Sequence, residues 1–232
     1  MHLNQGPPVM KTYFLFCAAF LPRVLSAEPL PELKPLLGER GALLFKEDFN
    51  APDAKPLTTI ASATAHIING ALWVSKLADA KHIGVSYLYS LGKDAPPPLT
   101  DFIMEADFRW DDGEGFNFEF TKPGKVEHGV APEFFVSFGK SKDPKRPVSW
   151  SITDNAPRTS VGKESAPLRD WEWYRVLIEV RHDEVAVQLS NGQTLRGKCN
   201  MASAPKRSPS ISYNGNGTTG FSFDNFKIWE MK

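Results

Sequence analysis

Apolar and polar residues alternate with a period of two along most of the chain. The clearest stretches are residues 72–75, 101–110, 116–121, 174–181 and 185–190. Such alternation is typical of β-strands that bury one face. No window of helical length carries an apolar stripe with a 3.6-residue period. The pattern therefore predicts about a dozen strands, no substantial helix and no internal repeat.

Residues that favour reverse turns separate these stretches. They are Asp111-Asp112-Gly113, His182-Asp183, Asn191-Gly192 and Asn214-Gly215, which suit tight connections between antiparallel strands. So many short strands in one domain of ~190 residues imply two packed antiparallel sheets. We expect an all-β protein, a two-sheet jelly-roll sandwich.

The last apolar stretch changes phase halfway along. Phe221 and Phe223 share one phase, and Phe226 and Ile228 share the opposite one. A regular strand cannot place both pairs on one side, so the sequence predicts a β-bulge at Asp224-Asn225. The alternative is a regular strand that is buried on both faces.

The N-terminal residues 1–27 have the three parts of a secretory signal peptide. A basic segment ends at Lys11, an apolar run covers residues 12–21, and small residues precede Glu28. The run is about half of the ~20 residues that cross a bilayer, so we expect no membrane span. Cleavage near Ala27 would give a secreted or periplasmic protein. The alternative is a buried N-terminal helix.

Residues 28–41 contain three prolines and predict an extended leader, with the β-sandwich domain at residues 42–232. Cleavage of the signal would remove Cys17 and leave Cys199 alone. One cysteine cannot form an internal disulfide, so the domain must be held by its core. This suits a bacterial type of exported protein.

Composition narrows the class of protein. Of the 232 residues, 41% are hydrophobic and 23% are charged, which excludes a disordered tail, a collagen and a multi-span membrane protein. Lysine plus arginine and aspartate plus glutamate both number 27. No net field therefore attracts the chain to nucleic acid, and we expect no nucleic-acid partner.

Several segments together resemble the concanavalin A-like lectin/glucanase superfamily, which includes laminin-G-like domains. They are residues 43–49, 70–74, 101–109, 173–187 and 220–228. The nearest resemblance is to the secreted 3-keto-disaccharide hydrolase-like domain of bacterial carbohydrate degraders. The likeness covers most of residues 42–232 and implies a sandwich whose first and last strands lie side by side. It supports a fold far more than a function.

The resemblance also implies that one sheet is concave and that its polar face forms a ligand groove. Glu105, Asp107 and Arg109 share one face of a strand, and Asn117 and Glu119 occupy polar positions of the next. Carboxylates and amides in a groove would hydrogen-bond sugar hydroxyls, so these five residues are candidate glycan ligands. The alternative is a solvated face with charges paired across strands.

Three of these residues, Glu105, Asp107 and Glu119, are also candidate catalytic carboxylates for glycoside hydrolysis. The glucanase branch carries a Glu-x-Asp-x-(x)-Glu strand, but Arg109 or Trp110 stands where its last glutamate belongs. That departure counts against this chemistry. A lyase would need a tyrosine or histidine base with arginine or asparagine. Tyr87, Tyr89, His128 and Arg109 are of these types, but the sequence does not bring them together.

Tryptophan is the other feature relevant to glycans, because an exposed indole can stack on the apolar face of a pyranose. Trp73 and Trp150 oppose or leave the apolar phase and are the candidate platforms. Trp110 shares the phase of Phe108 and is assigned to the core. Of Trp171 and Trp173, we expect one to pack inward and the other to cover an edge.

Calcium is the expected cofactor, because sandwiches of the resembled superfamily often hold a structural Ca²⁺ near the paired terminal strands. Glu47, Asp48 and Asp224 match that location. The loop 111–114 is an alternative, but it lacks an EF-hand pattern and suits a solvated turn. No Cys/His spacing suggests zinc, and no glycine-rich loop before a helix suggests a nucleotide.

The leading hypothesis is a secreted, non-catalytic carbohydrate-binding or cell-surface interaction domain whose partner is a glycan or polysaccharide. The alternative is a saccharide hydrolase, similar to the keto-disaccharide enzymes, or a polysaccharide lyase. A third possibility is a structural adhesion module without a small ligand. Which sugar is bound, and the oligomeric state, do not follow from the sequence.

Overall fold

The computed structural model describes residues 29–51, 59–60, 63–76, 85–86, 98–111, 113–122, 133–140, 148–156, 158–206, 209–214 and 220–232. The predicted signal peptide and the lyase candidates Tyr87, Tyr89 and His128 lie outside these residues. In this part of the chain the only helix is one 3₁₀ turn, η1 (Asn200–Ser203). It has neither the length nor the apolar character that a membrane crossing requires.

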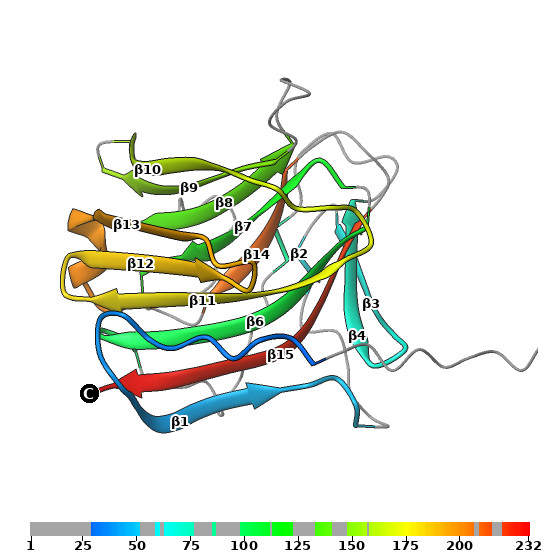
Figure 1. Cartoon of the computed structure of the whole chain (residues 1–232), viewed down its shortest axis with the longest axis horizontal. Coiled ribbons are helices and arrows are strands. Elements are labelled where there is room, and N and C mark those ends of the chain that lie inside the picture. Colours follow the sequence, from blue (N-terminus) through cyan, green and yellow to red (C-terminus); the bar gives the residue numbers. More distant parts are fainter. Residues whose placement is uncertain are drawn as a thin grey trace, which may run out of the picture.

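Two antiparallel sheets pack face to face, as the alternation predicts (Figure 1). One sheet has eight strands and contains the first and the last strand, so we call it the terminal sheet. Its strand order is β13 (Thr194–Lys198), β12 (Glu184–Leu189), β11 (Trp173–Arg181), β6 (Phe102–Asp111), β15 (Gly220–Met231), β4 (Ala71–Lys76) and β3 (Ala63–Ile68). Strand β1 (Arg40–Glu47) also pairs with β15. The other sheet has seven strands, and we call it the serine sheet after the serines on its outer face. Its strand order is β10 (Arg158–Ala166), β9 (Val148–Asn155), β8 (Phe134–Lys140), β7 (Gly115–Phe120), β14 (Ser210–Asn214), β5 (Val85–Ser86) and β2 (Thr59–Ile60).

The space between the sheets is filled by aromatic side chains. Phe108 and Trp110 of β6 meet Phe116 of β7, with ring centroids 5.3 and 5.8 Å from the Phe116 ring. Phe138 of β8 stacks on Phe116 at 5.0 Å. Burying one such side chain contributes about 1.5–3 kcal/mol. Trp110 is 1% exposed, so its assignment to the core is confirmed.

The closing strand β15 contains the predicted bulge. Its pairing with β6 shifts by one residue between Asp224 and Lys227, and Asn225 has a positive φ of 52°. The extra residue restores the phase, so the apolar side chains on both sides of the bulge are buried: Phe221, Phe223, Phe226 and Ile228. The second half of β15 pairs with β1, which confirms that the first and last strands lie side by side.

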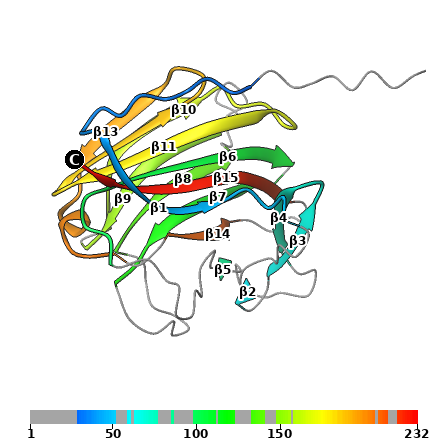
Figure 2. The same cartoon turned by 90° about the horizontal axis from the view of Figure 1, so that it is seen from below.

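The leader crosses the outer face of the terminal sheet. Leu33 packs on Ile103 of β6 and Leu177 of β11. The backbone N–H groups of Leu36 and Leu37 donate to the carboxylate of Glu179 at 2.7–2.9 Å. Figure 2 shows this segment outside the terminal sheet, on the side away from β7 and β14. The leader therefore covers part of one outer face, and the outer face of the serine sheet is on the other side of the molecule.

Candidate functional site

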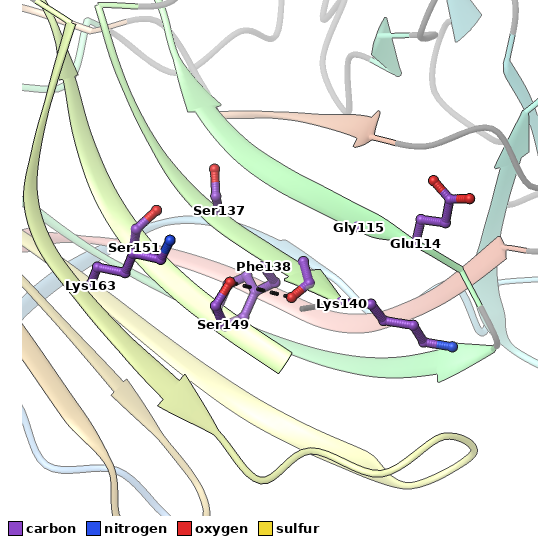
Figure 3. A pocket seen from close by; sticks show the side chains of 9 residues that line it. Glu114, Gly115, Ser137, Phe138, Lys140, Ser149, Ser151 and Lys163 are labelled. Carbon is purple, nitrogen blue, oxygen red and sulfur yellow. Dashed lines mark hydrogen bonds between the residues drawn. The ribbon is translucent and has the colours of Figure 1, made fainter. Parts of the chain in front are cut away.

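The outer face of the serine sheet carries a hollow of about 330 Å³ (Figure 3). Strands β7 to β10 and the turn before β7 supply its walls. Its lining is almost entirely small or charged: Glu114, Gly115, Ser137, Phe138, Gly139, Lys140, Ser149, Ser151 and Lys163. Figure 3 shows the serines on neighbouring strands, with Lys163 beside Ser151. The hollow is open to solvent and lined mainly by hydrogen-bonding groups.

Alternation along β8 and β9 explains this lining. Phe138 and Trp150 are buried in the core, so the residues beside them in the strand point outward. Direct cross-strand neighbours are Ser137 and Ser151, and Ser151 in turn faces Lys163 of β10. We call this surface the serine face; its serines are Ser137, Ser149, Ser151, Ser165, Ser210 and Ser212.

Two facing glycines leave space in the hollow. Gly139 of β8 lies directly opposite Gly115 of β7. A Cβ added at Gly139 would meet only the Glu114 carbonyl oxygen within van der Waals range, at 4.0 Å. The hollow is therefore shaped at this point by backbone, and peptide groups can be approached closely there.

A chain of hydrogen bonds runs from the hollow across the serine face. Ser137 Oγ donates to Asn117 Oδ1 at 2.7 Å, and Asn117 Nδ2 donates to Ser212 Oγ at 2.9 Å. Ser212 Oγ in turn donates to Glu119 Oε1 at 2.5 Å. Because each side chain is oriented by its neighbour, the Ser137 hydroxyl is held in a defined direction at the edge of the hollow.

Burial raises the pKa of the Glu119 carboxyl, and the hydrogen bonds from Ser212 and Asn117 partly offset this effect. Two of the residues chosen from the sequence, Asn117 and Glu119, therefore do belong to the polar network of this face.

The other three, Glu105, Asp107 and Arg109, lie on the opposite side of the molecule. Strand β6 belongs to the terminal sheet, whereas β7 belongs to the serine sheet. The prediction that all five side chains line one groove is therefore wrong. Alternation identifies residues that share a strand face, but the turn between β6 and β7 carries the chain from one sheet to the other.

Glu105 and Asp107 are buried in a network of cations. Arg175 donates to both oxygens of Asp107, at 2.7 and 2.9 Å. Arg40 and Lys227 bind Glu105 at 3.0 and 3.2 Å. A hollow of about 330 Å³ beside the leader is lined by this network: Glu32, Arg40, Glu105, Arg175, Lys227 and Trp229. The paired charges anticipated as the alternative are what the structure contains here.

The tryptophan predictions fare differently. Trp150 is fully buried and stacks on Phe138 at 6.1 Å, so its prediction as a sugar platform is wrong. It alternates with the outward Ser149 and Ser151 and therefore faces the core. Trp73 is half-buried on the outer face of the terminal sheet and stays a candidate. Trp173 lies on that same outer face beside Arg109, and Trp171 is 64% exposed. The prediction that one of these two tryptophans packs inward is therefore wrong.

The calcium ligands predicted from the resemblance do not form a site. Glu47 accepts the N–H of Phe49 at 2.7 Å, and Asp48 pairs with Lys46 at 2.9 Å. Among the described residues, no three carboxylate, histidine or cysteine side chains gather closely enough to hold a metal ion. The donor set of Glu47, Asp48 and Asp224 therefore does not fit calcium.

Of the residues that line the hollow, only Glu114 figures in the sequence predictions, as part of the 111–114 loop. Val148, Trp150 and Ile152 alternate with Ser149, Ser151 and Thr153 as clearly as any strand in the chain. That signal could have assigned β9 and its outward serines. Serine is common on solvated strands, however, and only the pairing of β7 to β10 shows that these serines are neighbours.

No protein-family model matches the chain, and no curated protein matches it by sequence. Solved structures do match. A protein of unknown function with a galectin-like fold from Bacillus subtilis superimposes with a TM-score of 0.62 at 13% identity, covering 84% of this chain and 98% of that one. Lectin II from Ulex europaeus has a TM-score of 0.59 at 16% identity, covering 82% and 99%.

The exoplasmic/lumenal domain of VIP36, in a form bound to Ca²⁺ and Man3GlcNAc, has a TM-score of 0.56 at 9% identity and covers 82% and 90% of the two chains. Identities this low show a shared fold. The chain has a lectin-like, concanavalin A-like sandwich, as the sequence predicted; the nearer likeness to the keto-disaccharide hydrolases stays a prediction.

Proposed function

We propose that this chain is a secreted, non-catalytic carbohydrate-binding protein that holds a sugar in the hollow of the serine face. The observation that carries the proposal is the hydroxyl-lined hollow on an open face of a lectin-like sandwich. A serine hydroxyl can both donate and accept, as a sugar hydroxyl does. A neutral polyol is recognised through several oriented groups of this kind.

The position of the hollow supports the same function. The leader covers part of the outer face of the terminal sheet, and the Glu105 and Asp107 carboxylates there are occupied by cations. On the serine face the hydrogen-bond chain orients Ser137, while Lys140, Lys163 and Glu114 add charged groups at the hollow. Sugars bound by structural neighbours, galactose in one lectin and mannose in VIP36, supply the first ligands to test.

The non-catalytic assignment is supported by the placement of the carboxylates. Glu119 lies on the serine face, whereas Glu105 and Asp107 lie on the opposite face, so Glu119 cannot pair with either across one glycosidic bond. The two that share a strand are each held by arginine or lysine. Export would follow from the predicted signal peptide at residues 1–27.

Gly139→Leu tests the proposal directly. The added side chain enters the hollow without meeting another atom closer than 4.0 Å at its Cβ, so the fold should be retained. We expect the affinity for a bound sugar to fall at least tenfold, which is ~1.4 kcal/mol. The measurement is calorimetric titration with galactose and mannose, after a glycan array has identified any further ligand.

Thr194→Leu is the matched control, because Thr194 is an exposed strand residue of the terminal sheet. It should leave the affinity unchanged. A folded Gly139→Leu protein that binds sugar as tightly as the wild type would reject the hollow as the site. Absence of binding to every sugar on the array would reject the function.

A further inference from the structure

Aromatic side chains and one arginine form a row across the end of the terminal sheet that the described leader residues do not reach. Direct cross-strand pairing places Trp173 of β11 opposite Arg109 of β6, and Arg109 opposite Ser222 of β15. Ser222 faces Trp73 of β4, and Trp73 faces His66 of β3. Because these strands are neighbours in the sheet, the row crosses them one after another, and Figure 1 shows β4 and β3 turned steeply relative to β6 and β11. We call these residues, with Trp171, the aromatic row.

Trp171 belongs to this row through Arg109, whose guanidinium carbon lies 5.7 Å from the centre of the Trp171 ring. The Trp171 side chain is 64% exposed, and its backbone has a positive φ of 66°. That region is unfavourable for a bulky residue, and a mostly exposed indole gains little from burial. Folding therefore gives little reason for tryptophan at this position, whereas a ligand that stacks on the indole would.

Trp73 lies at the other end of the row. Its indole is within 3.0 Å of where a Cβ of Gly220 would stand, so glycine allows the ring to lie close to β15. On β3 the His66 ring is stacked beside it, with centroids 6.1 Å apart. From β11 to β4 the row spans three strand spacings, ~14 Å, which suits several sugar rings in succession.

The charge in the middle of the row is compensated. Arg109 donates to both carboxylate oxygens of Asp111, at 2.5 and 3.2 Å, and Arg109 Nη2 donates to Ser222 Oγ at 3.3 Å. An arginine neutralised in this way still offers N–H groups, but it does not select an anionic ligand. The row therefore suits an uncharged ligand with both hydroxyl groups and apolar ring faces.

The described residues of the leader do not reach this end of the sheet. The first described contact of the leader with the sheet is a hydrogen bond from the Arg175 side chain to the Leu30 carbonyl. Arg175 of β11 lies directly opposite Asp107 of β6, two residues before Arg109. From there the leader continues to Leu33 on Ile103, away from Arg109. The aromatic row is thus one step along β6 beyond the covered region.

We propose that the aromatic row is a second ligand site, for a neutral polysaccharide chain, on the opposite side of the molecule from the hollow. Indole rings at both ends would stack on sugar rings of the chain, and Arg109 would donate to hydroxyl groups between them. This site is separate from the hollow and does not depend on it.

Trp171→Gly and Trp73→Ala test the proposal by affinity electrophoresis in gels that contain hydroxyethyl cellulose, glucomannan or galactan. Glycine suits the positive φ of position 171, so Trp171→Gly should fold at least as well as the wild type. We expect at least one of these neutral polysaccharides to retard the wild type. Each variant should weaken that binding about three- to tenfold. Trp171→Phe keeps an aromatic ring at the position and should retain most of the wild-type affinity.

Leu43→Ala is the matched control, because Leu43 is an exposed apolar residue of β1 and is 52% exposed. It should bind as the wild type does, and so should Gly139→Leu, whose substitution is on the other face. The proposal is overturned if none of the three polysaccharides retards the wild type or if the tryptophan variants are retarded equally. Tighter binding to alginate or polygalacturonate would overturn it in favour of an anionic ligand. Loss of binding in Gly139→Leu alone would assign the polysaccharide to the hollow.

Discussion

At the scale of single residues, Asp224 occupies an unfavourable place for a charge. It lies at the bulge of β15, and burial raises the pKa of its carboxyl to about 6. The nearby charges of Asp107, Asp48 and Glu47 add to this effect, and a hydrogen bond from the Asn225 N–H opposes it. Asp224 is therefore protonated up to a higher pH in the folded protein than in the unfolded chain.

This shift predicts the pH dependence of stability. Between pH 3.8, the ordinary pKa, and about 6, the folded state binds more protons than the unfolded state, so stability falls as pH rises. Asp224→Asn removes the charge but keeps an acceptor for the Asn225 N–H. After allowance for solvent screening, we expect about 1 kcal/mol of added stability at pH 7.5, or ~2–4 °C in Tm.

At pH 3.5 the wild type and Asp224→Asn should unfold at nearly the same temperature, because Asp224 is then protonated in the folded state and mostly protonated in the unfolded state. Thermal unfolding in chelator-treated buffer at the two pH values is the measurement. An equal difference in Tm between the two proteins at both pH values would show that the carboxyl charge does not cause the difference.

At the scale of elements, the leader depends on one buried carboxylate. Glu179 of β11 is fully buried and accepts the N–H groups of Leu36 and Leu37. Gln188 of β12 also donates to Glu179, at 3.1 Å, and to the Lys34 carbonyl at 2.7 Å. Arg181 donates to the Leu37 carbonyl. The leader is therefore fixed to the sheet by hydrogen bonds with side chains of β11 and β12.

Glu179→Ala leaves two backbone donors of the leader without their acceptor. We expect a loss of about 2–3 kcal/mol in the free energy of unfolding, measured by urea denaturation. Hydrogen exchange at the Leu36 and Leu37 amides should become faster. Glu184→Ala is the control: it removes an exposed carboxylate that pairs with Arg196 at 2.6 Å, and should lose less than about 1 kcal/mol. Equal losses in the two variants would contradict this role of Glu179.

The strands also show which features of the fold can be predicted from the sequence. Alternation gives the faces of β6, β7, β11 and β12, and the change of phase between Phe223 and Phe226 gives the bulge, because side-chain direction in a strand is a local property. The sheet to which a strand belongs is not local. The β6–β7 turn looks like a hairpin, yet its strands lie in opposite sheets, so the prediction that Glu105 and Glu119 share a groove is wrong.

The candidate site was predictable only in part for a related reason. Asn117 and Glu119 were found because amides and carboxylates are conspicuous on a strand, whereas Ser137 and Gly139 acquire significance only from their neighbours. The aromatic row is similar: Trp73 was found, but its relation to Trp173 crosses two strands from other parts of the chain.

At the scale of the whole molecule, the two proposed sites face in opposite directions. The hollow lies outside the serine sheet and the aromatic row outside the terminal sheet, with the aromatic core between them. A single chain that binds at both faces would hold two separate carbohydrates at once. No oligomer is needed for this kind of bivalency.

Bridging can be measured with beads that carry a sugar bound by the hollow, mixed with the soluble neutral polysaccharide bound by the aromatic row. The wild type should cross-link them into aggregates, as seen by light scattering. Gly139→Leu and Trp171→Gly should each reduce aggregation at a given protein concentration, although each keeps one binding face intact. Aggregation that is undiminished in both variants would show that the two faces do not act as separate sites.

The glycine at position 139 has a consequence for engineering. Because a Cβ at this position would have only the Glu114 carbonyl oxygen within van der Waals range, residues of increasing volume can be introduced there in small steps. Alanine, serine, valine and leucine would each shorten the accommodated ligand by a further increment while the core stays intact. Under the proposed function, position 139 is therefore the natural starting point for changing which saccharide the hollow accepts.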